Sequence, residues 1–70
     1  MKVQMFVPGT GCYGKHCPAV YKTDRGTFVV QGNLINGDDM ANFSLALHEG
    51  VVEIPETLVR ALAGKLEDKQ

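Results

Sequence analysis

The sequence predicts a small α+β domain, in which a mostly antiparallel β-sheet of four or five short strands is followed by one C-terminal amphipathic helix. Three observations predict this fold. Short runs of β-branched and aromatic residues are separated by glycine, proline and asparagine turns. A charged turn that contains glycine, at residues 23–26, is typical of a hairpin. Apolar residues recur at helical spacing after Pro55. At this length we expect a single domain over residues 1–70.

The first strand is expected over residues 2–7. Val3, Met5 and Val7 alternate with the other side chains of this run. Alternation therefore places these three on one face of the strand and Phe6 on the opposite face. The proline and glycine that follow end the strand.

A hairpin is expected from two strands at residues 19–23 and 27–31. Both runs are rich in β-branched and aromatic residues, and Gly26 tolerates the positive φ that a tight hairpin turn requires. Alternation along the second strand places Phe28 and Val30 on the same face. That face is suited to a core.

The stretch between the hairpin and the helix is expected to contain a loop and two more strands. The Asn-Gly-Asp sequence at residues 36–38 indicates a turn, and the alternation of apolar residues at 43–47 predicts a strand. A second turn at 48–50 leads into a short strand at 51–54, which is expected to pair with the strand before it.

The C-terminal segment predicts a helix over residues 55–66, followed by a frayed tail at 67–70. Pro55 suits the first turn, where its missing N–H would have no partner, and the carboxylate of Glu56 favours the positive end of the helix dipole. The residues that recur at spacings of three and four form one apolar stripe: Leu58, Val59, Leu62, Ala63 and Leu66.

The composition is that of an ordinary globular chain. Hydrophobic residues make up 44% and charged residues 21% of the sequence, unlike the low-apolar composition of disordered segments. The net charge of -1 gives no overall positive field for nucleic-acid binding. No apolar run approaches the ~18 residues of a membrane-spanning helix, and the N-terminus does not read as a signal peptide. We therefore expect a cytoplasmic protein with no membrane partner.

The segment GTGCYGKHCP, at residues 9–18, raises the question of a metal site. It holds Cys12, His16 and Cys17, and His48 is the only other histidine. A tetrahedral zinc site needs four such ligands, usually from two closely spaced pairs. Zinc bound by these four side chains is one interpretation, although only one short-spaced pair is present.

Three other interpretations of Cys12 and Cys17 are open. A disulfide would close a small ring, worth about 2 kcal/mol through loop entropy, and would make the segment redox-responsive. A catalytic thiol would need a nearby base and a lowered pKa, and so short a chain has little room for a substrate cleft. Because cytosolic thiols normally stay reduced, we favour two small buried hydrophobic residues that fix a glycine-rich turn. We expect no cofactor, with zinc as the alternative.

The C-terminal helix carries more apolar surface than one small sheet can cover. Each of its large side chains is worth ~1.5 to 3 kcal/mol if fully buried. The strands offer further apolar residues on a second face, namely Phe6, Tyr21, Val29 and Leu34. A second subunit that buried this surplus would compensate for a small core. We expect a homodimer whose interface is formed by Leu58, Val59, Leu62 and Leu66.

Lys22 and Arg25 allow a different interpretation of the hairpin. With Lys15 and His16 they could form a basic patch for DNA, but Asp24 lies between them and dilutes the charge. We favour a solvated face, with DNA binding by Lys22 and Arg25 as the alternative.

Two segments, CPAVYKTDRGTFVVQG at residues 17–32 and VEIPETLVRAL at 52–62, resemble small actinobacterial proteins of the Bld-B type. The shared elements are a cysteine before the first hairpin strand, a charged turn before the VVQG strand, and an Ile-Pro helix start. These proteins are short developmental regulators that accompany helix-turn-helix regulators in streptomycete genomes. The resemblance covers roughly the middle and C-terminal two thirds of the chain. It implies a non-enzymatic, self-associating protein in transcriptional or developmental control.

The segment VVEIPETLVRAL also resembles the swapped-hairpin DNA-binding dimers of the transition-state-regulator type, in which a strand leads through Ile-Pro into a short helix. Those domains carry more arginine and lysine on the binding face than Lys22 and Arg25 provide.

The sequence contains no nucleophile elbow, phosphate-binding glycine loop or pair of carboxylates suited to acid–base chemistry. We therefore expect a non-enzymatic protein that acts by protein–protein interaction as a homodimer. The resemblance implies in addition that it is a regulatory protein that modulates a helix-turn-helix regulator. The alternatives are a DNA-binding dimer and a zinc- or redox-responsive module at Cys12 and Cys17.

Overall fold

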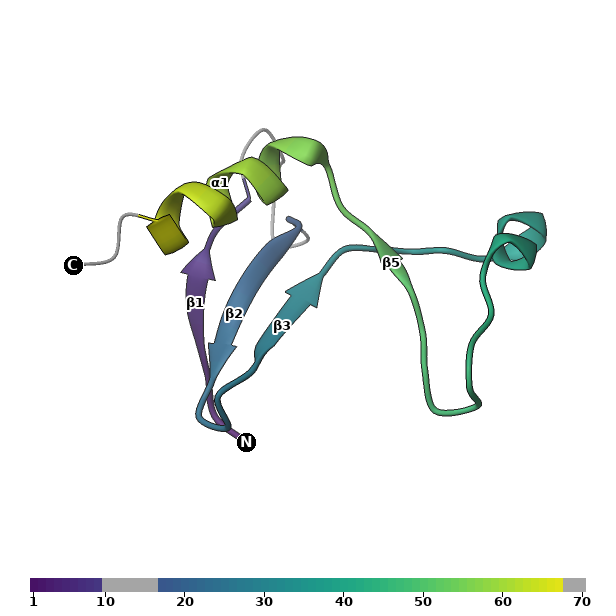
Figure 1. Ribbon diagram of the computed structural model, residues 1–70, viewed down its shortest axis with the longest axis horizontal. Coiled ribbons are helices and arrows are strands. Elements are labelled where there is room, and N and C mark those ends of the chain that lie inside the picture. Colours follow the sequence, from purple (N-terminus) through teal and green to yellow (C-terminus); the bar gives the residue numbers. More distant parts are fainter. Residues whose placement is uncertain (10–16, 68–70) are drawn as a thin grey trace.

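The computed structural model describes residues 1–9 and 17–67 (Figure 1). Its elements follow one another as strands β1 (Val3–Val7), β2 (Ala19–Thr23), β3 (Phe28–Gln31) and β4 (Asn33–Leu34), the 3-10 helix η1 (Gly37–Asn42), strand β5 (Val52–Glu53) and helix α1 (Glu56–Glu67). Strands β1, β2 and β3 form one antiparallel sheet in that order, and β4 and β5 form a separate antiparallel pair. The predicted α+β fold class, with an antiparallel sheet and one C-terminal helix, is confirmed.

The predicted hairpin between β2 and β3 is present. Gly26 adopts a φ of +77° in its turn, a conformation that other residues disfavour. Thr23 fastens the turn through both its backbone and its side chain. Its N–H donates to the carbonyl oxygen of Thr27 at 3.0 Å, and its hydroxyl accepts the N–H of Arg25 at 3.1 Å.

The register of β2 and β3 assigns residues to the two faces of the sheet. Val20 lies opposite Val30, and Lys22 lies opposite Phe28. Directly opposed residues share a face, so all four lie together, as the alternation predicts. Helix α1 packs on this face through Leu58, which contacts Val20 in the core. We call it the helix-side face.

A β-bulge in β1 changes the predicted alternation. Met5 lies opposite Tyr21, but the next pair is Val7 opposite Val20, so Phe6 is an extra residue in the strand. Val7 therefore joins the buried cluster on the helix-side face, and Phe6 packs against the same cluster. The prediction that Val7 shares a face with Met5 and opposes Phe6 is wrong, because alternation assumes uninterrupted pairing.

The buried core is small. Val20 is fully buried, and Leu58 and Val7 retain only 4% and 5% of their exposure. Ile54 and Leu62 are partly buried and pack around these three. One helical turn and the centre of one sheet thus hold the fold together.

Helix α1 begins where the sequence predicts. The carbonyl oxygen of Pro55 accepts hydrogen bonds from the N–H groups of Leu58 at 3.0 Å and Val59 at 3.4 Å, so Pro55 precedes the first helical residue. The observed helix is displaced by one residue from the predicted range, because Pro55 contributes only its carbonyl oxygen to the first turn. Glu67, predicted to belong to the frayed tail, is helical, and the rest of that tail lies outside the described residues.

Residues 33–54 form an arm that leaves the end of β3 and returns to the start of α1 (Figure 1). Strands β4 and β5 pair at its base, with Asn33 opposite Glu53 and Leu34 opposite Val52. The remainder of the described chain, β1 to β3 and α1, is the body. The radius of gyration is 13.6 Å, against about 11 Å for a compact chain of this length. The arm therefore makes the molecule extended.

The strand predicted at 43–47 does not form, although all five residues are described, and the predicted strand at 51–54 is reduced to β5, which pairs with β4 instead. Gly37, at a φ of +66°, opens η1, and irregular backbone then leads to a turn in which Glu49 N–H donates to the carbonyl oxygen of Ala46 at 3.0 Å. The alternation at 43–47 predicted a strand wrongly, because no neighbouring strand lies beside this run to pair with it.

Gly32 fixes the base of the arm. A Cβ at this position would lie 2.5 Å from the carbonyl oxygen of Glu53 and 2.7 Å from Cγ2 of Ile54. Only glycine lets the outgoing chain pass so close to the returning one. This contact therefore fixes the point at which the chain entering the arm passes the chain leaving it.

Replacing Gly32 with alanine is expected to lower the free energy of unfolding by about 1 to 3 kcal/mol, because the new methyl group would overlap backbone atoms that cannot easily move. Gly50→Ala is the matched control, since nothing lies within 4 Å of a Cβ at that position. Urea denaturation at one protein concentration measures both variants. Equal stability of the two would contradict the close crossing.

Candidate functional site

More large apolar side chains are exposed than buried in the described part of the chain. The buried hydrophobic core is limited to Val7, Ala19, Val20 and Leu58. The exposed side chains lie on the arm, on the helix-side face and on the opposite face of the sheet. Exposed apolar surface on this scale marks an interaction site.

Two of these exposed apolar residues lie on the helix-side face of the sheet, and two more lie on α1, which packs on it. Phe28 and Val30 project from the edge strand β3 and are 44% and 37% exposed. Val59 and Leu66 are 48% and 44% exposed on α1, where their spacing of two turns places them on one side of the helix. The face is therefore only partly covered by the helix that packs on it.

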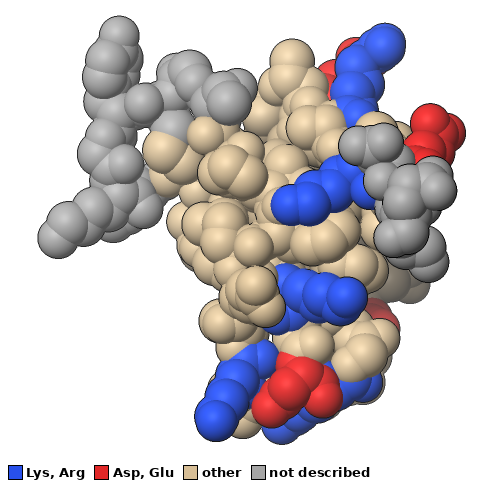
Figure 2. Space-filling model, turned by 90° about the vertical axis from the view of Figure 1, so that its left-hand side faces the viewer, with Lys and Arg blue, Asp and Glu red and all other residues tan. Residues whose placement is uncertain are grey.

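Lysine side chains border this apolar surface. Lys22 is the cross-strand partner of both Gln4 and Phe28, and Lys2 precedes Gln4 by two residues, which places it on the same side. A shallow hollow that opens to solvent lies at this end of the sheet, and the carboxylate of Asp24 lies among its lysines. It is lined by Lys2, Val3, Gln4, Lys22, Thr23 and Asp24. Figure 2 shows lysine and arginine side chains gathered along the side of the molecule formed by β1 and the end of α1.

Lys65 brings a further cation from α1 to this face. Its Nζ lies 4.7 Å from the centre of the Phe6 ring and donates a 2.8 Å hydrogen bond to the Phe6 carbonyl oxygen. The Phe6 ring in turn lies 5.2 Å from the ring of Phe28. A cation over an aromatic ring is worth ~0.5 to 1 kcal/mol at an exposed site. The helix-side face thus combines two phenylalanines with three lysines, which suits a partner that is both acidic and apolar.

The helix residues predicted as an interface divide into two pairs. Val59 and Leu66 remain exposed and available. Leu62 is half-buried against the core, and Leu58 is buried within it. The prediction for Leu58 is corrected accordingly, because the helix lies on the sheet with this side chain innermost.

The two residues predicted to contact nucleic acid lie at different places. Lys22 is on the helix-side face, whereas Arg25 is exposed in the turn between β2 and β3, next to Asp24. Sequence reasoning missed Lys2 and Lys65 as neighbours of Lys22. Their proximity depends on strand register and helix packing, which no local pattern in the sequence reports.

The cysteine segment is described only at its end. Cys17 is disulfide-bonded, whereas Cys12 and His16 lie outside the described residues. The carbonyl oxygen of Cys17 accepts a 2.9 Å hydrogen bond from Gln31 Nε2, and Gln31 Oε1 accepts one of 3.1 Å from the Tyr21 hydroxyl. The interpretation of Cys17 as a reduced, buried thiol is therefore wrong. A disulfide sulfur is also not the thiolate that binds zinc or acts as a nucleophile.

His48, the distant member of the predicted zinc site, is exposed on the arm. The arm extends away from the start of β2, which follows Cys17 (Figure 1). Within residues 1–9 and 17–67, no three histidine, cysteine, aspartate or glutamate side chains gather as a metal site would require. The structure does not bring Cys17 and His48 together.

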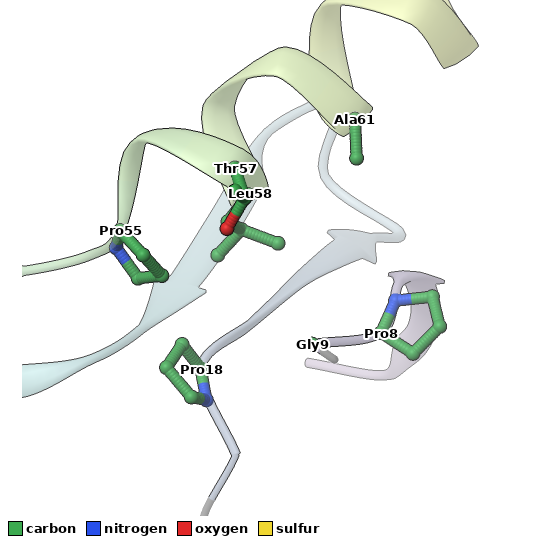
Figure 3. A pocket seen from close by; sticks show the side chains of 7 residues that line it. All are labelled: Pro8, Gly9, Pro18, Pro55, Thr57, Leu58 and Ala61. Atoms are coloured by element: carbon green, nitrogen blue, oxygen red, sulfur yellow. The ribbon is translucent and has the colours of Figure 1, made fainter. Parts of the chain in front are cut away.

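A small hollow lies where α1 begins, beside the end of β1 and the start of β2 (Figure 3). In Figure 3 the side chains of the helix start face the prolines of the two strand ends across it. None of its lining residues is ionisable, and the only side-chain polar group among them is the Thr57 hydroxyl. The described residues that line the hollow therefore offer shape but no acid or base for catalysis. Its lining residues are Pro8, Gly9, Pro18, Pro55, Thr57, Leu58 and Ala61.

Comparison of the chain with protein-family models, with curated proteins and with solved structures found no match. In the described part of the chain, no helix combines the length and the apolar character needed to cross a membrane.

Cys17 is expected to resist alkylation until the protein is reduced, because a disulfide sulfur does not react with iodoacetamide. The unreduced protein is denatured, treated with iodoacetamide and digested, and the peptide that contains Cys17 is identified by mass spectrometry. A sample reduced before alkylation is the control and should be modified at Cys17. Modification without reduction would contradict the disulfide.

Proposed function

We propose that this protein is a non-enzymatic binding protein that works as a homodimer and holds a partner protein through its exposed apolar surface. The observation that carries the proposal is the accessible area of the folded chain. That area is 5951 Å². A compact monomer of 7.6 kDa is expected to expose about 4,300 Å².

The chain therefore exposes more surface than a compact monomer of its mass, as expected of a subunit that buries part of its surface against a partner. The exposed surface of the described residues is rich in large apolar side chains, which favour burial over contact with water. In the part of the chain that the structure describes, by contrast, only four hydrophobic residues are buried. A core in a chain of this size rarely supplies more than ~3 to 5 kcal/mol, so association supplies stability that the single chain lacks.

The class of partner follows from the resemblance to Bld-B-type regulators. That resemblance implies that the dimer modulates a helix-turn-helix regulator and acts in transcriptional or developmental control. The partner would bind apolar surface that remains exposed after the dimer has formed.

Direct DNA binding is the second candidate, and the lysines on the helix-side face favour it. Lys2, Lys22 and Lys65 lie on one face, and Arg25 lies in the adjoining turn. Asp24 among these cations and the net charge of -1 weaken this candidate. Protein binding is therefore the function we propose.

Sedimentation equilibrium over a range of concentrations tests the proposed dimer. The wild-type chain is expected to dimerise, and the double variant Val59→Asp, Leu66→Asp to dimerise at least about tenfold more weakly, because each apolar side chain lost from an interface is worth ~1.5 kcal/mol or more. Both residues are exposed in the single chain, so the fold should survive.

Gly64→Asp is the matched control, since it adds a carboxylate to the same helix at a position where nothing lies within 4 Å of a Cβ, on the side away from Val59 and Leu66. Circular dichroism checks that all three proteins are folded. A wild-type chain that stays monomeric at every concentration would refute the homodimer.

A further inference from the structure

We propose that the dimer forms by reciprocal docking, in which the arm of each copy, residues 33–54, lies on the helix-side face of the other copy. This inference rests on the proposed self-association and specifies its surfaces. The occupant of the helix-side face is thus a second copy of this chain. Three properties of the molecule carry the inference: the distribution of charge, the state of the arm and the place of the arm relative to the body.

Charge is divided unevenly between arm and body. The arm contains four of the eight acidic residues and no lysine or arginine. All seven lysines and arginines lie in the rest of the chain, together with the other four acidic residues. The acidic residues of the arm are Asp38, Asp39, Glu49 and Glu53.

The body presents the opposite charge on the helix-side face. Lys2 and Lys22 border its solvent-open hollow, and Lys65 lies over the Phe6 ring. Among the described residues, the only ion pair is the one between Arg60 and Glu56 on α1. Neither Lys2 nor Lys22 therefore has a carboxylate of this part of the chain within salt-bridge distance. These lysines are therefore available to carboxylates from another molecule. Opposite charges on two surfaces steer them together and fix their orientation.

The arm is poorly supported by its own chain. No residue from Asn33 to Glu53 is buried. Two strands of two residues each and one 3-10 helix give it little hydrogen bonding, and an isolated two-stranded pair is at best marginally stable in water. Apolar side chains nevertheless project from it, including Leu34, Phe43 and Leu47, which are 77%, 45% and 107% exposed. The arm therefore presents a surface that is both apolar and acidic for docking on the partner.

The arm does not pack on the helix-side face of its own chain, because it points away from the sheet (Figure 1). The contact of Gly32 with Glu53 and Ile54 fixes the direction in which it leaves. Its complement must therefore come from another chain. A two-fold axis then makes each arm–face contact twice, since an isologous dimer pairs the same two surfaces reciprocally.

A nucleic acid would use the same lysines, but the observations favour the second copy. Phosphates would be attracted by Lys2, Lys22 and Lys65 alone and repelled by the acidic arm. The arm of a second copy satisfies these lysines and also covers Phe28 and Val30, whose apolar surface a phosphate backbone would leave exposed.

Two charge-reversed chains test the inference. One carries Lys2→Glu and Lys22→Glu on the helix-side face, and the other carries Asp38→Lys and Asp39→Lys on the arm. Each alone is expected to dimerise at least about tenfold more weakly than the wild type at low salt, since like charges then meet at both contacts. An equimolar mixture is expected to form a heterodimer close to wild-type affinity, because both of its contacts regain opposite charges. Rescue on mixing also excludes misfolding as the cause of the weakening.

Arg60→Glu is the matched control for Lys22→Glu, because it makes the same change in net charge on the solvent side of α1, where Arg60 is 76% exposed in a pair with Glu56. It is expected to leave dimerisation unchanged. Sedimentation equilibrium measures every chain and the mixture.

The failures are distinguishable. A monomeric wild type refutes the proposed homodimer and this inference with it. Reciprocal docking is refuted if the wild type forms a stable dimer and both charge-reversed chains dimerise equally well, or if the mixture contains no heterodimer. Self-association would still stand in either case. A wild-type chain that binds fluorescent oligonucleotides, with binding lost on Lys2→Glu and Lys22→Glu while the dimer persists, assigns the helix-side face to nucleic acid and also refutes the inference.

Discussion

The contact between Val20 on the central strand and Leu58 on the helix is the interaction on which the rest of the structure depends. It holds α1 on the sheet, and among residues 1–9 and 17–67 only Val7 and Ala19 join these two as buried hydrophobic residues. So small a core leaves little free energy to order any segment that does not touch it. The arm is such a segment, and the exposed apolar surface of the molecule is the direct consequence of how small the core is.

Charge and exposed apolar surface are divided between the body and the arm. The body retains the lysines, with Lys65 anchored on Phe6 at the helix-side face, while the arm holds carboxylates and large apolar side chains with no buried residue of its own from Asn33 to Glu53. Each region lacks what the other provides. The tight crossing at Gly32 gives the arm a defined direction, and the proposed docking of two copies depends on that direction as well as on charge.

Local patterns in the sequence predicted the elements whose causes are local. The Gly26 turn and its flanking β-branched residues predicted the hairpin, and Pro55 with the following apolar stripe predicted α1. The patterns failed where long-range contacts decide. The bulge at Phe6 moved Val7 to the other face, and residues 43–47 alternate like a strand but have no strand beside them. The site was only partly predictable for the same reason. Val59 and Leu66 follow from helical spacing, whereas the meeting of Lys2, Lys22 and Lys65 depends on register and on how the helix lies across the sheet.

We propose that a single chain is too small to stabilise itself and that a second copy covers its exposed apolar surface. Urea denaturation of the wild-type protein at protein concentrations spanning roughly a hundredfold range tests this proposal. Unfolding of a dimer to separate chains depends on concentration by mass action, so the account predicts a midpoint that rises steadily with protein concentration. A midpoint that is the same at every concentration would mean that the single chain holds its own fold, and would contradict the account.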